Sequence, residues 1–256
     1  RQDKDGYFGS KDNSRMYGHG IVTLALSELA GMGVDRAMNE VLRRRCQAGV
    51  DLILRSQNAK KRTGQDGGWR YVPTADDSDL SVTVWQLMAL RSAKNSGFEV
   101  PGTAIERAVD YIKRSHRAGK GRAEFREPTG FGYQVGGRSV WSTAAEGLLA
   151  LQVCGEYQSQ EVLSTADWLL EHPPKVQGTE WFFYGTYYYA QGMYQRGGNH
   201  ADDAARRVAE VLLPMQEADG SWKPAGGQEG SMRVYRTAMA MLSLGVKYHY
   251  LPIYQR

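Results

Sequence analysis

The sequence predicts an all-α fold built from repeated helical hairpins. A turn motif of Gln, two residues, Asp-Gly, one residue and an aromatic residue occurs at residues 2–8 and again at residues 216–222. Segments with helical periodicity fill the chain between such turns, and no segment shows the sustained alternation and hairpin turns of a sheet. Self-similarity of this kind indicates a fold in which each unit packs on the next.

The turn motif has a physical reason. Glycine adopts the positive φ that a tight reversal needs, and aspartate accepts hydrogen bonds from nearby backbone amides. A third copy is stretched, because Gln57 is separated from the turn at residues 66–69 by a basic loop. A degenerate fourth copy lies at residues 130–133. The motifs therefore mark the joints between helical segments.

The helical segments fall into two kinds. Segments rich in small and apolar residues are expected to be covered on both sides, whereas amphipathic segments with a charged face belong to an outer layer. The expected inner helices are 16–30, 79–93, 139–153, 182–195 and 233–246. The expected outer helices are 36–56, 104–115, 160–171 and 200–213.

The length and composition of the chain favour a single domain over residues 1–256. Since the chain opens on a turn of the repeat, we expect that a helix pair preceded it in the parent protein. The net charge of +4 is mild. The short basic runs at residues 43–45 and 60–62 are interpreted as solvated surface, and nucleic-acid binding would need a broader basic face.

Further observations exclude two classes of protein. No apolar run approaches the roughly 18 residues of a membrane span, so we expect no transmembrane segment. The two cysteines, Cys46 and Cys154, provide neither a disulfide framework nor a metal-binding spacing. No cofactor is indicated. Localisation and oligomeric state stay open.

One joint differs from the others because it carries an acidic cluster. Asp76, Asp77 and Asp79 place three carboxylates within four residues, directly before the inner helix that begins near residue 79. Carboxylates at that position cap free amides and suit the helix dipole, and we favour this interpretation about two to one over catalysis. The cluster is nevertheless the first candidate for a chemical site.

These repeats, alternating with helix pairs over nearly the whole chain, resemble the terpenoid cyclases (squalene and hopene cyclases) and the β subunits of protein prenyltransferases. The resemblance implies an α/α toroid, in which inner helices surround a cavity that holds an isoprenoid chain. It is more specific for the fold than for an activity, since complement thioester domains have a similar toroid and are not isoprenoid enzymes.

The resemblance to prenyltransferases implies where zinc ligands would stand in this sequence, but two of those positions hold other residue types. Those enzymes use Asp-x-Cys at the start of an inner helix and a His in a Tyr-His-Thr step of a later one. The matching residues here are Asp79-Leu80-Ser81 and Tyr235-Arg236-Thr237. Serine is a poor zinc ligand and arginine is none, so we expect no zinc.

The resemblance to squalene–hopene cyclases implies an acid. Those enzymes use Asp-x-Asp-Asp followed by Thr or Ser, and the middle Asp protonates an alkene. This chain has Asp76-Asp77-Ser78-Asp79 and then Ser81, in which the residue types agree and the order does not. Crowded carboxylates can keep one proton, because like charges raise one pKa.

Carbocation chemistry also needs an aromatic lining. For each single ring, core packing is the better interpretation. His19 is another candidate for the cavity, and a hydrogen-bonded structural histidine is the interpretation we favour. Arg236 lies in an apolar helix and needs an anionic partner, for which Asp79 is the expected residue. The candidate cavity residues are Tyr17, His19, Trp85, Trp141, Tyr184, Tyr187, Tyr188, Tyr235 and Arg236.

Three functions stay open from the sequence. The first is a domain that binds an apolar, isoprenoid-like ligand without proven chemistry. The second is a terpenoid cyclase-like enzyme that uses Asp76, Asp77 and Asp79 as its acid cluster. The third is a protein-interaction scaffold.

Overall fold

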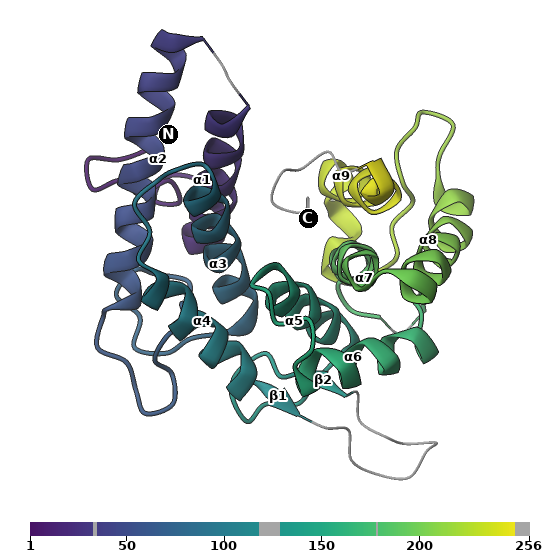
Figure 1. Ribbon diagram of the computed structural model, residues 1–256. Coiled ribbons are helices and arrows are strands. Elements are labelled where there is room, and N and C mark those ends of the chain that lie inside the picture. The colour runs from purple at the N-terminus through teal and green to yellow at the C-terminus, as the bar shows by residue number, and fades with distance from the viewer. Residues whose placement is uncertain (33–34, 118–128, 178, 249–256) are drawn as a thin grey trace. The chain divides into compact units, whose positions relative to one another are not determined.

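The structure is a computed structural model that describes residues 1–32, 35–117, 129–177 and 179–248. Those residues are mostly helical, and the only sheet among them is a short antiparallel pair, β1 (His116–Arg117) and β2 (Gly130–Phe131). The all-α prediction is confirmed (Figure 1).

The chain divides into two compact units. Of the described residues, unit 1 contains Arg1–Ser115 and Tyr133–Gly137, and unit 2 contains His116–Gly132 and residues 138–248. Each unit is described by itself below. The sequence-based prediction of one domain over residues 1–256 stays a prediction.

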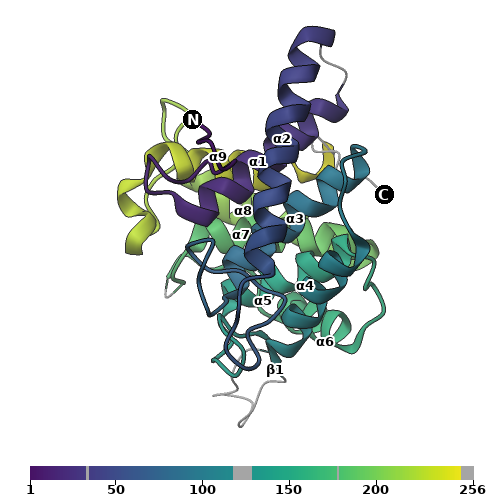
Figure 2. The ribbon, with the colours of Figure 1, turned by 90° about the vertical axis from the view of Figure 1, so that its left-hand side faces the viewer.

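Unit 1 consists of two helical hairpins. Its helices are α1 (Arg15–Gly31), α2 (Arg36–Gln57), α3 (Leu80–Asn95) and α4 (Gly102–Arg114). The inner helix α3 packs against α1, α2 and α4, and almost all of its residues are buried. Figure 2 looks onto this unit, with the long outer helix α2 alongside α1 and α3. The inner and outer assignments in this half of the chain are therefore confirmed.

Unit 2 continues the pattern. The inner helices α5, α7 and α9 pack in chain order, α5 against α7 and α7 against α9, while α6 and α8 cover them. In the described part of this unit, three short 3-10 helices accompany them. The elements are α5 (Trp141–Val153), α6 (Gln160–Glu171), α7 (Phe182–Arg196), α8 (Gly198–Leu212), η2 (Leu213–Met215), η3 (Gly227–Ser231), α9 (Arg233–Leu244) and η4 (Val246–Tyr248).

Side chains of the repeated turn motif donate hydrogen bonds to the backbone of the turn and of neighbouring helices. In the stretched copy at Gln57 and residues 66–69, the Gln57 side chain donates to the carbonyls of Gly67 and Ala104, at 2.8 Å each. The indole of Trp69 is fully buried and donates to the carbonyl of Ile53 on α2 at 2.9 Å. Gly67 has a φ of 87°, as the turn requires. The motif thus ties each turn to the outer helix before it.

The same arrangement appears at the last copy, in unit 2. The Gln216 side chain donates to the Gly220 carbonyl at 3.3 Å, and the Trp222 indole donates to the Leu212 carbonyl at 2.8 Å. The two copies use the same residue types for the same bonds. This explains why the motif recurs at the joints without a need for chemistry at each one.

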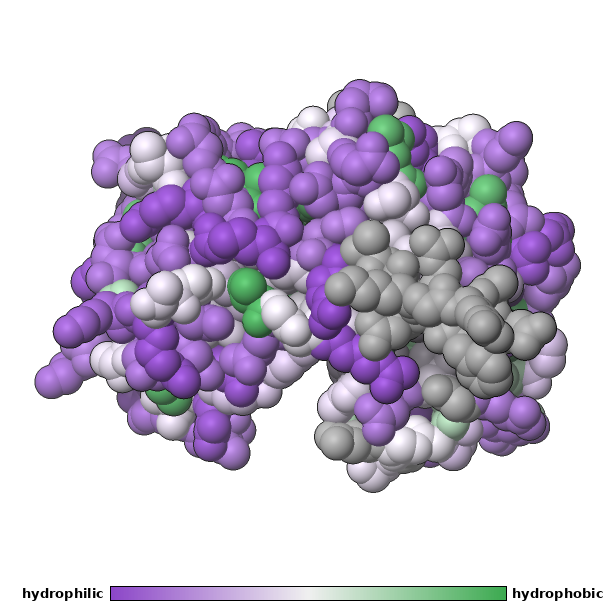
Figure 3. Space-filling model, turned by 90° about the horizontal axis from the view of Figure 1, so that it is seen from below, coloured by the Kyte–Doolittle hydropathy of each residue, from purple (hydrophilic) through white to green (hydrophobic). Residues whose placement is uncertain are grey.

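The surface is mainly polar where Figure 3 shows it, and hydrophobic residues appear there singly outside the grey atoms. Single exposed apolar residues are normal for a protein surface. Of the helices that the structure describes, none combines the length and apolar character that crossing a bilayer requires.

Candidate functional site

The acidic segment, residues 76–79, leads directly into α3 in unit 1. Asp79 is the N-cap residue of α3, with an extended backbone, and its Oδ1 accepts a hydrogen bond from the Val82 amide at 2.8 Å. Its own amide donates to the Trp69 carbonyl at 2.9 Å, which ties the cap to the turn motif. The helix-capping interpretation is confirmed for Asp79.

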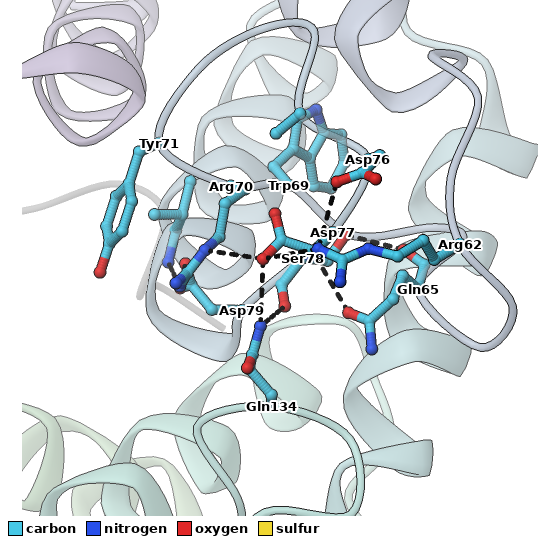
Figure 4. A network of polar contacts seen from close by, with 12 residues as sticks. Arg62, Gln65, Trp69, Arg70, Tyr71, Asp76, Asp77, Ser78, Asp79 and Gln134 are labelled. Carbon is cyan, nitrogen blue, oxygen red and sulfur yellow. Dashed lines mark hydrogen bonds and ion pairs between the residues drawn. The ribbon is translucent and has the colours of Figure 1, made fainter.

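Two arginines lie among the three carboxylates (Figure 4). Arg70 places Nη1 2.6 Å from Oδ2 of Asp79 and Nε 3.3 Å from Oδ2 of Asp77. Arg62 places Nη2 3.4 Å from Oδ2 of Asp77 and 3.1 Å from Oδ1 of Asp76. Each carboxylate of the segment therefore has a cation beside it, and the repulsion expected from the sequence is offset locally.

The basic run at residues 60–62 is exposed at Lys60 and Arg62, as predicted, and it also contacts the acidic segment. It was expected to be solvated surface, but Lys61 donates through Nζ to the carbonyls of Ala75 and Asp77, at 2.8 and 3.0 Å. Arg62 makes the two ion pairs given above. Lys61 and Arg62 lie in the loop of the stretched turn motif, and residues 75–77 lie in the segment before α3. These contacts hold the two charged loops together.

Arg70 is itself held by two tyrosines. Its guanidinium carbon lies 4.3 Å from the ring centre of Tyr71 and 5.4 Å from that of Tyr133. Nη1 also donates to the Tyr133 hydroxyl at 3.0 Å, and the two tyrosine hydroxyls are 2.5 Å apart. Tyr17 of α1 extends this group, with its ring centre 6.0 Å from that of Tyr71. The two rings thus fix the orientation of the Arg70 guanidinium.

The electrostatics of Asp79 follow from its burial. The side chain is fully buried, and loss of hydration raises its pKa to about 6. Hydrogen bonds from Val82, Arg70 and Tyr133 act in the opposite direction and lower the pKa. Both carboxylate oxygens accept N–H donors, so near neutral pH the group is an ionised helix cap, and proton donation requires acidic conditions.

The predicted partner of Arg236 is wrong. Arg70 takes the place at Asp79 that was expected for Arg236. Arg236 is buried in unit 2 and donates to the carbonyl of Trp222 through Nε and Nη2, both at 3.2 Å, and to the carbonyl of Glu229 at 3.3 Å. Backbone carbonyls satisfy guanidinium donors as a carboxylate does. The buried arginine therefore fastens the last turn motif to α9.

The remaining predicted residues are spread over both units. His19 is fully buried, where its Nδ1 accepts from the Phe8 amide and its Nε2 lies 3.1 Å from the Gly49 carbonyl, so it is the hydrogen-bonded structural histidine that we favoured. Burial lowers its pKa to about 4. Trp85 is buried in α3. In unit 2, the Trp141 indole donates to the His172 carbonyl at 2.8 Å. A ligand-lining role for these residues stays a prediction.

The sequence did not reveal four residues that the structure places in polar networks: Arg70, Tyr133, Glu146 and Glu229. Glu146 had a visible signal, since it is the one charged residue in the apolar α5. Arg70 follows directly on the Trp69 of a turn motif. Tyr133 ends the degenerate turn copy at residues 130–133, and Glu229 lies in η3; both are far in the sequence from their partners, which no local pattern predicts.

No metal centre is visible in the described part of the chain. No group of three or more His, Cys, Asp and Glu side chains is placed there to hold an ion. Asp79, at the position matched to a zinc ligand, is already engaged by Arg70 and Val82. The expectation that the protein binds no zinc stays a prediction.

Comparison with known proteins shows the fold. No family model matches the chain, and no curated protein sequence matches it. Among solved structures, a protein from Actinoplanes has a TM-score of 0.57 and 16% identity, over 100% of this chain and 78% of its own. The type II terpene cyclase MstE from Scytonema, a variant in complex with its product merosterolic acid A, has a TM-score of 0.52 and 12% identity, over 99% of this chain and 71% of its own.

At these sequence identities the structural similarity shows the fold and does not show a function. It extends over the whole chain in both cases, so it includes the helices of both units. The predicted fold class, all-α with the inner and outer helices of the α/α-toroid class, is thereby confirmed, and the chain has a terpene cyclase-like fold.

Proposed function

We propose that the protein binds an apolar, isoprenoid-like ligand along its inner helices, without catalysis at the acidic segment. The observation that supports this proposal is a set of exposed apolar side chains on an inner helix of each unit, taken separately. On α1, Ile21 and Leu29 are 43% and 44% exposed, and on α9, Val234 and Met241 are 84% and 61% exposed. A helix at a protein surface normally turns polar residues outward. An apolar ligand is a suitable occupant for such faces.

The likeness of fold supports the same class of ligand. The Scytonema cyclase is described with a terpenoid product bound. An isoprenoid chain needs extended apolar surface and few polar contacts, because its burial is driven by the area removed from water. We therefore choose polyprenyl alcohols and squalene as the first compounds to test.

A paired substitution tests the proposal. Met241 of the inner helix α9 and Met38 of the outer helix α2 are both well exposed, at 61% and 51%. We expect saturable binding of geranylgeraniol or squalene to the wild type in equilibrium dialysis. Met241→Glu should weaken binding about tenfold, by placing a charge on the apolar contact surface, while Met38→Glu leaves it unchanged. Absence of saturable binding, or equal losses in the two variants, refutes the proposal.

A cyclase-like activity is the second candidate, because burial raises the pKa of Asp79 to about 6. Proton donation to an alkene would need the neutral carboxyl, and Arg70 at 2.6 Å favours the ionised form. We therefore expect binding without cyclised product when extracts are analysed by gas chromatography and mass spectrometry. Reproducible cyclised product, abolished by Asp77→Asn or Asp79→Asn, would establish the cyclase instead.

A further inference from the structure

The first turns of α2 project from unit 1. None of residues 36–41 is buried, whereas eight of the residues from Leu42 to Gln57 are. Figures 1 and 2 both show this end of α2 beyond the other helices of the unit. Met32, the C-cap residue of α1, lies three residues before Asp35, the N-cap residue of α2. We call residues 32 and 35–45 the α1–α2 tip.

The α1–α2 tip exposes large apolar side chains where a surface helix normally carries polar ones. Met32, Met38 and Val41 are 62%, 51% and 37% exposed. Met38 and Val41 are three residues apart in α2, so they are neighbours on one side of the helix. A single exposed apolar residue needs no explanation, but three at one projecting end indicate an interaction surface.

Arginines follow the apolar residues along α2. Arg44 and Arg45 are exposed, and among the residues that the structure describes no acidic side chain forms an ion pair with either of them. Arg36 lies 3.5 Å from Glu40, in an exposed contact that salt screens. Residues 35–45 hold four arginines against two acidic residues, so four minus two gives the tip a net charge of +2.

The order of the two groups along α2 matches the layers of a lipid surface. An α-helix rises about 1.5 Å per residue, so Arg44 and Arg45 follow Met38 by about 10 Å along the axis. Amphipathic segments at a bilayer surface bury their apolar side chains to a similar depth, about 5–10 Å. When Met38 is at the acyl boundary, the two guanidinium groups are therefore at the level of the lipid phosphates.

The projecting shape favours lipid over a folded protein partner. A protein would need a recess that complements the tip, because specific interfaces are closely packed. Fluid lipid closes around a projecting group without such a recess. The net positive charge selects anionic lipids, since basic segments next to a bilayer are attracted by its negative surface potential.

We propose that the α1–α2 tip binds the surface of a bilayer that contains anionic lipids. Met32, Met38 and Val41 enter the apolar boundary, and Arg44 and Arg45 contact the phosphates. The inference goes beyond the proposed function and does not depend on it. It would bring the protein to the phase in which polyprenyl alcohols and squalene dissolve.

Vesicle flotation at low ionic strength tests the inference. The wild type should bind vesicles of phosphatidylcholine with about 30% phosphatidylserine about tenfold more tightly than vesicles of phosphatidylcholine alone. Met38→Glu should weaken binding to the anionic vesicles about tenfold, because it places a carboxylate at the apolar boundary. In Arg44→Gln with Arg45→Gln, the preference for anionic vesicles should fall below about twofold.

The fold should survive Met38→Glu, because an acidic residue in the first turn of α2 suits the helix dipole. Circular dichroism checks this, and Met32→Glu carries the same prediction if Met38→Glu does not fold. Leu213→Glu, at a residue of unit 2 that is 54% exposed, should leave vesicle binding unchanged. Arg138→Gln with Lys223→Gln removes two exposed cations of unit 2 and should retain the tenfold preference.

Several results would overturn the inference: no flotation, equal binding to the two kinds of vesicle, or equal losses in the tip variants and the control variants. A dimer in analytical ultracentrifugation that Met38→Glu abolishes, without vesicle binding by the wild type, would assign the tip to a second copy of the chain instead. None of these results decides the dialysis of geranylgeraniol, in which Met38→Glu is the control.

Discussion

The acidic segment of unit 1 and the carboxylates of Glu146 and Glu229 in unit 2 have different hydrogen-bonding and ionic partners. Both regions hold buried carboxyl groups beside the inner helices. In unit 1, Arg62 and Arg70 form ion pairs with the three carboxylates, and Lys61 is a third cation close to them. In unit 2, Glu146 is held by a phenol and Glu229 by two amides. Burial raises the pKa of Glu229, and the two amides and the Arg236 guanidinium act against this rise.

This difference distinguishes the two regions. A carboxylate paired with arginine is part of the scaffold, because breaking the pair leaves a buried charge. The carboxylates of Glu146 and Glu229, in contrast, accept hydrogen bonds from a phenol and from two amides. The region most conspicuous in the sequence is therefore the one built on ion pairs with arginine.

The largest effect is expected for the arginine in unit 1. Arg70→Met removes the cation from the fully buried Asp79, so we expect the free energy of unfolding to fall by about 3 kcal/mol in urea titrations. Arg62→Met is the matched control. The Arg62 side chain is 62% exposed, and its loss should cost less than about 1 kcal/mol. Equal losses for the two variants would mean that Asp79 does not depend on Arg70.

A smaller effect is expected at the carboxylate of unit 2 that caps α7. Glu229→Ala removes the acceptor for the amides of Phe183 and Tyr184, and leaving them unsatisfied should cost about 2 kcal/mol. Glu217→Ala, an exposed change in the same connecting segment, should be neutral in the same urea titration. A neutral Glu229→Ala would show that other groups cap α7.

The smallest effect is expected at the tyrosine pair beside Arg70. Tyr133→Phe keeps the ring but removes the hydroxyl that accepts from Arg70 and bonds Tyr71, so we expect a loss of about 1 kcal/mol in thermal unfolding. Tyr248→Phe serves as the control, because Tyr248 is 59% exposed. A loss well above that of Arg70→Met would place the tyrosines, and not the ion pair, at the centre of the network.

The sequence predicted the fold well because the fold depends on short-range patterns. The turn motif at residues 66–69 and the periodicity of α3 act over a few residues, and both were read correctly. Capping by Asp79 could also be predicted from its place before α3.

Polar partners far apart in the sequence could not be predicted in the same way. Arg70 reaches Tyr133 across 63 positions, and Glu229 reaches Phe183 across 46. No periodicity links such residues, because their contact depends on how hairpins pack. The pairing of Arg236 with Asp79 was predicted wrongly for the same reason. An arginine in an apolar helix indicates that it needs acceptors, but the sequence does not indicate which groups they are. Glu146 shows the same signal, because it is the one charged residue in the apolar helix α5.

The pH dependence of Asp79 links stability to its role. Its folded-state pKa, about 6, is above the ordinary 3.8. Its contribution to stability is therefore present in full below 3.8 and is lost as the pH rises through about 6. At neutral pH the carboxylate is ionised, and burial of its charge is tolerated because Arg70 and Val82 surround it.

The most direct test of the account is a titration of the Asp79 carboxyl carbon by NMR, with Asp79→Asn used to assign the signal. We expect the signal to titrate with a midpoint near pH 6 and to report an ionised carboxylate at neutral pH. That result fits a helix cap paired with Arg70. A carboxyl that is still protonated above neutral pH would contradict the account, because the acidic segment would then hold the proton that alkene protonation requires.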